Sequence, residues 1–159
     1  MSLDVNTPLG QQTLRDEGFA ADLFERHYKA RYLHTPKDRA SRLDAFVLKG
    51  NTLCAVALTS CRYNVTLATF HSTFDCEMLL TWRKVQVGAW LSRGLQVPLL
   101  GLLYFVPDRV LMVAKLYDLD HWAVPFRRAL TETQATVNGG RALRMNVFID
   151  MSRATQIAG

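Results

Sequence analysis

One carboxylate interrupts an otherwise apolar segment in the first third of this 159-residue chain. Residues 41–49 and 52–62 are apolar at most positions, and Asp44 stands within the first of these two segments. A carboxylate held away from water is unfavourable unless a metal ion, a basic group or an open sheet edge compensates it. Asp44 is therefore either part of a metal or catalytic site, or half of a structural salt bridge with Arg42 or a helix lysine.

The two apolar segments are predicted to be paired strands. Gly50-Asn51 between them suits the positive φ angles of a tight turn, so the pairing is predicted to be antiparallel. Along the second strand, the period of two places Val56, Leu58, Ser60 and Arg62 on one face. Because both strands are apolar at most positions, both faces of the hairpin are predicted to be covered.

The remaining pattern predicts helices and strands around this hairpin. The helices are predicted over 7–32, with a stripe at Ala20, Leu23, Phe24 and Tyr28, and over 75–95, with Asp75 at its start and Gly94 at its end. Further strands are predicted over 99–106, 109–116 and 143–151, the last after a turn at 138–140. The chain is thus predicted to be one α/β domain, residues 1–159, with a mixed sheet flanked by helices.

The hairpin resembles the catalytic hairpin of the PD-(D/E)XK nuclease superfamily. In that family a metal-binding Asp on one strand is followed by Glu-x-Lys on the next; here Asp44 takes the first place and Leu58-Thr59-Ser60 the second. Arg62 is similar to a basic residue that faces the nucleic acid backbone in relatives. Beyond Tyr63 the likeness is one of layout, to the restriction-endonuclease-like αβββαβ core and to compact phage-encoded members.

The resemblance implies hydrolysis of phosphodiester bonds with Mg²⁺ or Mn²⁺, but two of the expected groups are absent. A leucine does not bind a hard cation, and a serine hydroxyl does not replace an ammonium. Glu77 and Lys84 are seven residues apart, on one face of the predicted helix, and would replace the missing groups if that face overlooks the hairpin. The alternative is an ordinary solvated helix face.

The candidate residues follow from this alignment. A third carboxylate is expected from the first helix, at Glu25 or, as a second choice, at Glu17. The candidate catalytic residues are Asp44, Ser60, Glu77 and Lys84, and the candidate metal ligands are Asp44, Glu77 and Glu25.

The net charge of +5 and the pI near 9.4 favour a polyanionic partner. A basic cluster is expected near the mouth of the cleft, formed by Lys29, Arg31, Lys37, Arg39 and Arg42. Of these, Lys37, Arg39 and Arg42, together with Arg62, are the candidates for phosphate contacts, which bring affinity without sequence preference. The expected partner is nucleic acid, DNA before RNA; a solubilising basic surface is the alternative.

Other patterns narrow the function classes. Three cysteines without zinc-knuckle spacing indicate reduced thiols, and the first residues lack the layout of a signal peptide. Residues 88–106 are interrupted by polar residues and proline, so no membrane span is expected. A cytoplasmic location is predicted, in a host cell if the chain is phage-encoded. The histidines are scattered, and Trp82, Trp90 and Trp122 are expected to be packing residues.

Three functional hypotheses remain. The first is a nuclease-fold protein that binds nucleic acid and hydrolyses it with a metal, provided that the catalytic groups have migrated. The second is a catalytically inactive nuclease-like domain that serves DNA binding or assembly with a partner. The third regards Leu58 and Ser60 as substitutions introduced into an otherwise active chain.

Overall fold

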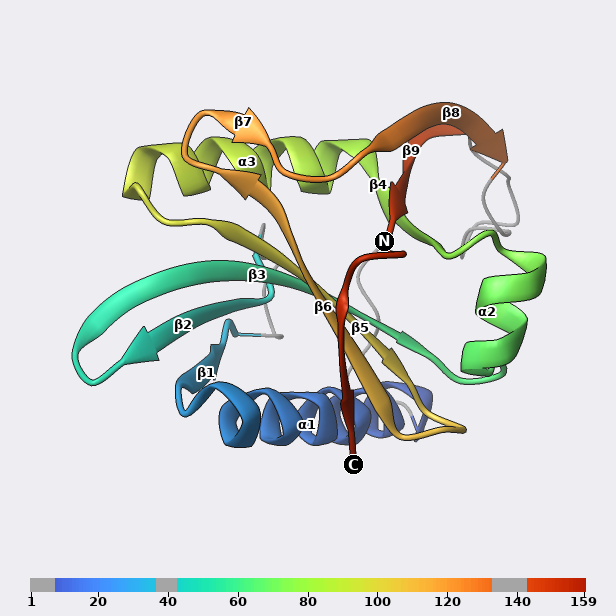
Figure 1. Cartoon of the computed structure of the whole chain (residues 1–159), viewed down its shortest axis with the longest axis horizontal. Coiled ribbons are helices and arrows are strands. Elements are labelled where there is room, and N and C mark those ends of the chain that lie inside the picture. The colour runs from blue at the N-terminus through green and yellow to red at the C-terminus, as the bar shows by residue number, and fades with distance from the viewer. Residues whose placement is uncertain (1–7, 37–42, 133–142) are drawn as a thin grey trace.

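A mixed seven-stranded sheet, the main sheet, lies between two helices at the centre of the structure (Figure 1). The structure, a computed structural model, describes residues 8–36, 43–132 and 143–159. The elements of the main sheet and its two helices are, in chain order, α1 (Pro8–Tyr28), β1 (Arg31–His34), β2 (Ala45–Lys49), β3 (Thr52–Arg62), α3 (Trp82–Leu95), β5 (Leu99–Phe105), β6 (Val110–Asp118), β7 (His121–Trp122) and β10 (Thr155–Ala158).

The elements of the main sheet follow the predicted order αβββαβ, but the third strand, β1, precedes the hairpin, in a segment that was predicted to be the helix end and a connector. β1, β2 and β3 form an antiparallel meander, and β5 pairs with β3 in parallel after the chain has passed through α3. β6 and β10 extend the sheet beyond β5, and β7 pairs with β6. The predicted class, an α/β domain with a mixed sheet flanked by helices, is therefore correct.

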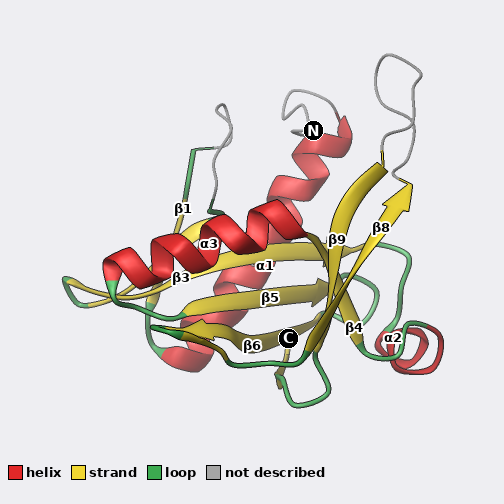
Figure 2. Cartoon of the chain, turned by 90° about the horizontal axis from the view of Figure 1, so that it is seen from above, coloured by secondary structure: helices red, strands yellow, loops and turns green. Residues whose placement is uncertain are grey.

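The two helices cover opposite faces of this sheet, each over its own apolar cluster (Figure 1 and Figure 2). On one face Ala20, Leu23 and Phe24 of α1 pack on alternate residues of the strands. On the other face Val85 and Ala89 of α3 pack on the side chains that point the opposite way. The period of two in β2 and β3 thus divides the strand residues between two buried cores.

The predicted antiparallel hairpin is confirmed, but its first strand begins at Ala45 instead of residue 41, so Asp44 lies just before the strand; residues 41 and 42 lie outside the described residues. Of the two turn residues, only Gly50 has a positive φ. Gly50 has a φ of 60°, which a residue without a Cβ adopts at little cost. Ala45 lies opposite Ala57, so Asp44, just before β2, lies at the level of Leu58 and Thr59.

The helix predicted over 75–95 is wrong in its first third. Asp75 and Cys76 have φ angles of 53° and 59°, which end any helix there. The strand β4 (Glu77–Thr81) follows, because Met78 and Leu80 alternate into the core and pair with a later strand. α3 begins only at Trp82, and Gly94 lies inside it, with Gln96 in the left-handed cap. The first helix also ends earlier than predicted, at Tyr28.

A second, three-stranded sheet was not predicted as such. β9 (Leu143–Asp150) lies between β4 and β8 (Phe126–Glu132), and all neighbours are antiparallel. The strand predicted over 143–151 is β9, whereas the turn predicted at 138–140 lies outside the described residues. The short helix α2 (Leu67–Thr73) lies beside this sheet, capped by the Thr66 hydroxyl, which accepts from the Thr69 N–H at 3.1 Å. None of the described helices has the length and apolarity needed to cross a membrane.

Candidate functional site

Asp44 lies at the start of β2 with its side chain toward α3, and it is 8% exposed. Lys84 Nζ, from the first turn of α3, lies 2.9 Å from Asp44 Oδ2. The Thr59 backbone N–H donates to the same oxygen at 2.8 Å. Of the two explanations offered for this carboxylate, the salt bridge to a helix lysine is thus present, and its partner is the lysine proposed for catalysis.

The backbone that carries Asp44 is held by the residue that follows β1, the strand beside β2. The Thr35 hydroxyl donates to the carbonyl of Leu43 at 2.6 Å, and the Thr35 N–H donates to the carbonyl of Asp44 at 3.0 Å. Tyr32 and Thr59 share a buried hydrogen bond between their hydroxyl groups, and burial raises the pKa of Tyr32 above its ordinary value. The position of Asp44 is therefore set by Lys84 of α3 and by the neighbouring strands β1 and β3.

The residue aligned with the missing glutamate is part of the core. Leu58 is fully buried on the α3 face of β3. A Cβ built on Gly88 of α3 would lie 3.6 Å from Leu58 Cδ1, so the helix backbone packs directly over this side chain. Ser60, two residues further along the same face, is half-buried. This place holds hydrocarbon and one hydroxyl group, which do not bind a hard divalent cation.

The other candidate carboxylates have partners of their own. Glu77 lies on β4 instead of a helix, and its two oxygens accept from Arg127 at 3.1 and 3.0 Å. Glu25, on the α1 side of the main sheet, accepts from the Tyr32 N–H at 3.2 Å. In the described part of the chain, no group of three His, Cys, Asp or Glu side chains gathers to hold a metal ion. The expected triad of Asp44, Glu77 and Glu25 is therefore not assembled, and the residues present do not fit Mg²⁺ or Mn²⁺.

Helical spacing placed Lys84 correctly and Glu77 wrongly. Lys84 does face the hairpin, because it lies on α3. Glu77 does not share that helix, because the chain between them changes from strand to helix at Thr81 and Trp82. The seven-residue spacing therefore has no structural meaning here.

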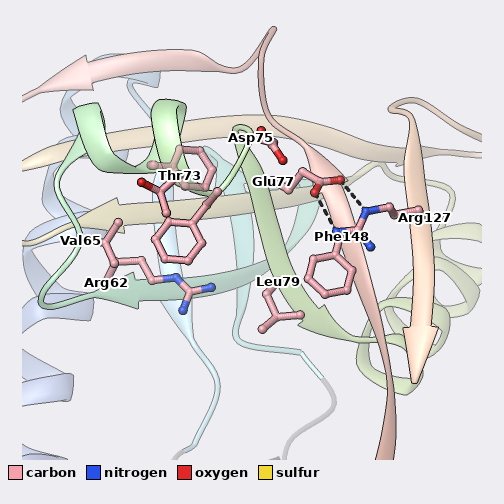
Figure 3. Close-up of a pocket in the computed structure, with 10 residues that line it drawn as sticks. Arg62, Val65, Thr73, Asp75, Glu77, Leu79, Arg127 and Phe148 are labelled. Atoms are coloured by element: carbon pink, nitrogen blue, oxygen red, sulfur yellow. Dashed lines mark hydrogen bonds and ion pairs between the residues drawn. The ribbon is translucent and has the colours of Figure 1, made fainter. Parts of the chain in front are cut away.

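Of the predicted phosphate-binding residues, the structure describes only Arg62. Lys37, Arg39 and Arg42 lie outside the described residues. Arg62 is the last residue of β3 and lines a cavity of about 270 Å³ between α2 and the second sheet (Figure 3). Burial lowers the pKa of Arg62. The cavity wall also contains the Glu77–Arg127 pair and Asp75, so one charged pair, one further cation and one further carboxylate lie in it.

Sequence reasoning missed the outer face of α3. Arg83, Gln86, Trp90 and Arg93 recur at helical spacing and are exposed, with the Trp90 side chain at 69%. The expectation that Trp90 is a packing residue is wrong, whereas Trp82 and Trp122 do pack together, with ring centroids 5.7 Å apart. α3 contains three basic residues and no acidic residue. That composition was the available signal, but the misplaced helix start obscured it.

The comparisons with known proteins leave the family open. No family model, no curated protein and no solved structure matches this chain. The likeness to the PD-(D/E)XK superfamily therefore remains a prediction from residues 41–63 and from the order of the elements.

Proposed function

We propose that this chain is a nuclease-like domain that binds nucleic acid through the outer face of α3 and does not hydrolyse it. The observation that carries this proposal is the charge of α3, which has Arg83, Lys84 and Arg93 but no carboxylate. Lys84 is engaged with Asp44, and neither Arg83 nor Arg93 has an ion-pair partner among the described residues. Two guanidinium groups are thus available for phosphate oxygens.

The spacing along α3 suits a strand of nucleic acid. Ten residues separate Arg83 from Arg93, a rise of about 15 Å. Trp90 lies between them on the same face and offers an exposed indole. An indole gains by stacking only on a base that is not already stacked in a duplex, so the surface favours single-stranded DNA or RNA.

The binding test is a titration of labelled single-stranded and duplex oligonucleotides, followed by fluorescence anisotropy at several salt concentrations. We expect salt-sensitive binding that is tighter for the single strand. The double variant Arg83→Gln/Arg93→Gln should reduce the slope of log K against log salt by about 1.4, since each charge contributes about 0.7 on single strands.

The matched control is Arg15→Gln/Arg26→Gln, which removes the same charge from α1 on the opposite face. This control should leave the slope almost unchanged. Binding that is insensitive to salt, or an equal loss in the two double variants, would refute the assignment to α3.

The contribution of the indole is tested separately. Trp90→Leu should weaken single-strand binding about tenfold, since stacking on one base contributes about 1–3 kcal/mol. Trp90→Phe should retain most of the affinity. If both variants bind single strands as the unsubstituted protein does, the preference for unpaired bases has another origin, although the phosphate surface would stand.

Metal-dependent hydrolysis is the competing function, and one observation favours it: a lysine lies 2.9 Å from the aligned aspartate. The test is incubation of the protein with DNA and RNA in Mg²⁺ or Mn²⁺. We expect no cleavage, because Asp44 is paired with Lys84 and Leu58 occupies the ligand position. Cleavage that disappears in Asp44→Asn would refute the absence of hydrolysis. The proposed binding surface on α3 would still be tested by the oligonucleotide titrations.

A further inference from the structure

We propose that the cavity between α2 and the second sheet binds a small aromatic carboxylate, with Arg62 as the group that recognises its charge. This cavity lies apart from the outer face of α3, and the inference does not rest on nucleic acid binding. Its walls are Arg62, Val65, Phe70, Thr73, Phe74, Asp75, Glu77, Leu79, Arg127 and Phe148.

Arg62 is the unusual wall residue because it is a half-buried cation that forms no ion pair with a described residue. Figure 3 shows its guanidinium group directed into the cavity. No hydrogen bond or ion pair joins the Arg62 side chain to another described residue, and burial alone lowers its pKa. A desolvated guanidinium group is unfavourable unless an anion accepts its hydrogen bonds, which a carboxylate does in a bidentate manner.

Arg127, in the same wall, differs from Arg62 because its guanidinium group has a carboxylate partner. It donates to both oxygens of Glu77, and its Cζ lies 4.0 Å from the centroid of the Phe148 ring (Figure 3). The charges of Arg127 and Glu77 therefore cancel within the wall. Arg62 is left as the cation that an incoming anion would meet.

The rest of the cavity is suited to a single flat ring. The half-buried Phe148 contributes aromatic surface, and Phe74 is 48% exposed, so part of its ring remains uncovered. Phe70 also lines the cavity, but it is 2% exposed and belongs to the core behind it. A volume of about 270 Å³ is below the usual range for drug-sized ligands. One aromatic ring with one charged group is therefore the expected size of ligand.

Two cations and two carboxylates line the cavity, so its walls carry no net charge, and a ligand with more than one negative charge is disfavoured. Asp75 also lines the cavity and is exposed, so it repels a second negative charge. With one unpaired cation and this carboxylate, the site favours a carboxylate over a doubly charged phosphate monoester.

The experiment uses three probes on the nitrogen-15-labelled full chain, followed by NMR: benzoate, benzyl alcohol and acetate. Benzoate has both ring and charge, benzyl alcohol has the ring alone, and acetate has the charge alone. We expect saturable shifts of the amides of Arg62, Phe74 and Phe148 with benzoate, and binding at least tenfold weaker for the other two probes. Equal binding of benzoate and benzyl alcohol, or no saturable shift with benzoate, would overturn the proposal.

Variants separate Arg62 from the general basic charge of the chain. Arg62→Met keeps an unbranched stem and should raise the benzoate Kd at least tenfold, whereas Arg83→Met, the matched exposed arginine of α3, should not change it. Phe74→Ala removes a ring that is 48% exposed, and should weaken benzoate binding several-fold even if Arg62→Met fails to fold. If both variants fold and bind benzoate as tightly as the unsubstituted protein, the site is contradicted. If Arg62→Met does not fold, unchanged benzoate affinity in Phe74→Ala contradicts it.

Discussion

α1 and α3 cover opposite faces of one sheet with similar apolar stripes, yet their charges differ. α1 carries four carboxylates and two arginines, whereas α3 carries three basic residues and no carboxylate. Each helix also takes part in satisfying one buried carboxylate. Asp16 of α1 is 2% exposed and accepts from the neutral amide of Gln12 at 3.2 Å, whereas Asp44 of the sheet accepts from the ammonium of Lys84.

The comparison teaches that the apolar pattern places a helix on a sheet, whereas charge distinguishes the two faces. The α1 side holds its carboxylate by a neutral hydrogen bond and keeps its outer charges mixed. The α3 side uses one of its cations on Asp44 and leaves the other two to solvent. A polyanion is therefore attracted to the α3 face and partly repelled from the α1 face.

The largest expected effect comes from removing the cation on the α3 side. Lys84→Met should lower the free energy of unfolding by about 2–3 kcal/mol, because it removes the ammonium that pairs with the buried Asp44 carboxylate. Lys84 is 32% exposed, so the loss is less than for a fully buried pair. Urea unfolding measures the change. Arg83→Met on the same helix is the control and should change stability by less than about 0.5 kcal/mol. An equal effect of the two variants would show that the ion pair contributes little.

The two buried carboxylates provide the next test. Asp44→Asn should lower the free energy of unfolding by about 1–2 kcal/mol, because Lys84 loses its counter-charge. Asp16→Asn should change it by no more than about 0.5 kcal/mol, because Gln12 is neutral and loses no charge partner. Thermal and urea unfolding of both isosteric variants measure the difference. Equal costs would mean that the amide and the ammonium support their carboxylates equally well.

Most of the main sheet could be predicted from local pattern. The apolar runs at 41–49 and 52–62, with Gly50-Asn51 between them, predict the hairpin, and the stripe of α1 predicts the face it buries. The break at Asp75 could not be foreseen, because positive φ angles at Asp75 and Cys76 are stabilised by the surrounding fold. The segment Glu77–Thr81 has no strong local preference, and its pairing with β9 some 70 residues later decides its structure.

The residues around Asp44 could be predicted only in part, because their contacts also join distant parts of the chain. A carboxylate in an apolar strand requires a partner, and that argument correctly directed attention to Asp44. The cation that pairs with Asp44 depends on where α3 begins and how this helix crosses β3. Lys84 is 40 residues away along the chain, so local pattern does not identify it as the partner. Glu77 was misplaced because its local pattern is compatible with both helix and strand. Arg62 was identified from the hairpin, but the unpaired state of its guanidinium group became visible only with α2 and the second sheet in place.

Two helix glycines test how closely each helix approaches the sheet. A Cβ on Gly18 of α1 would meet nothing within 4 Å, so Gly18→Ala should stabilise the fold by about 0.5–1 kcal/mol through helix propensity. A Cβ on Gly88 of α3 would lie 3.2 Å from two methyl carbons of the fully buried Leu99. Gly88→Ala should therefore destabilise by about 1 kcal/mol. If both substitutions stabilise the protein, α3 has room to move away from Leu99.

The smallest effect concerns the phenols on the α1 side. Burial raises the pKa of Tyr63 and of Tyr104, and the carboxylate of Asp16 adds to both shifts. A hydrogen bond to Thr13 partly opposes the shift of Tyr63. A raised pKa in the folded state means that stability is full below the ordinary tyrosine pKa near 10 and falls as the pH rises through the folded value. Absorbance at 295 nm follows phenolate formation. Asp16→Asn should lower the pKa of both phenols slightly, toward the value in the unfolded chain, and so reduce the stability that is lost at alkaline pH. Asp22→Asn, which removes a carboxylate elsewhere on α1, should leave both phenols as they are. Equal shifts in the two variants would mean that the general negative charge of α1, not the buried carboxylate, acts on these tyrosines.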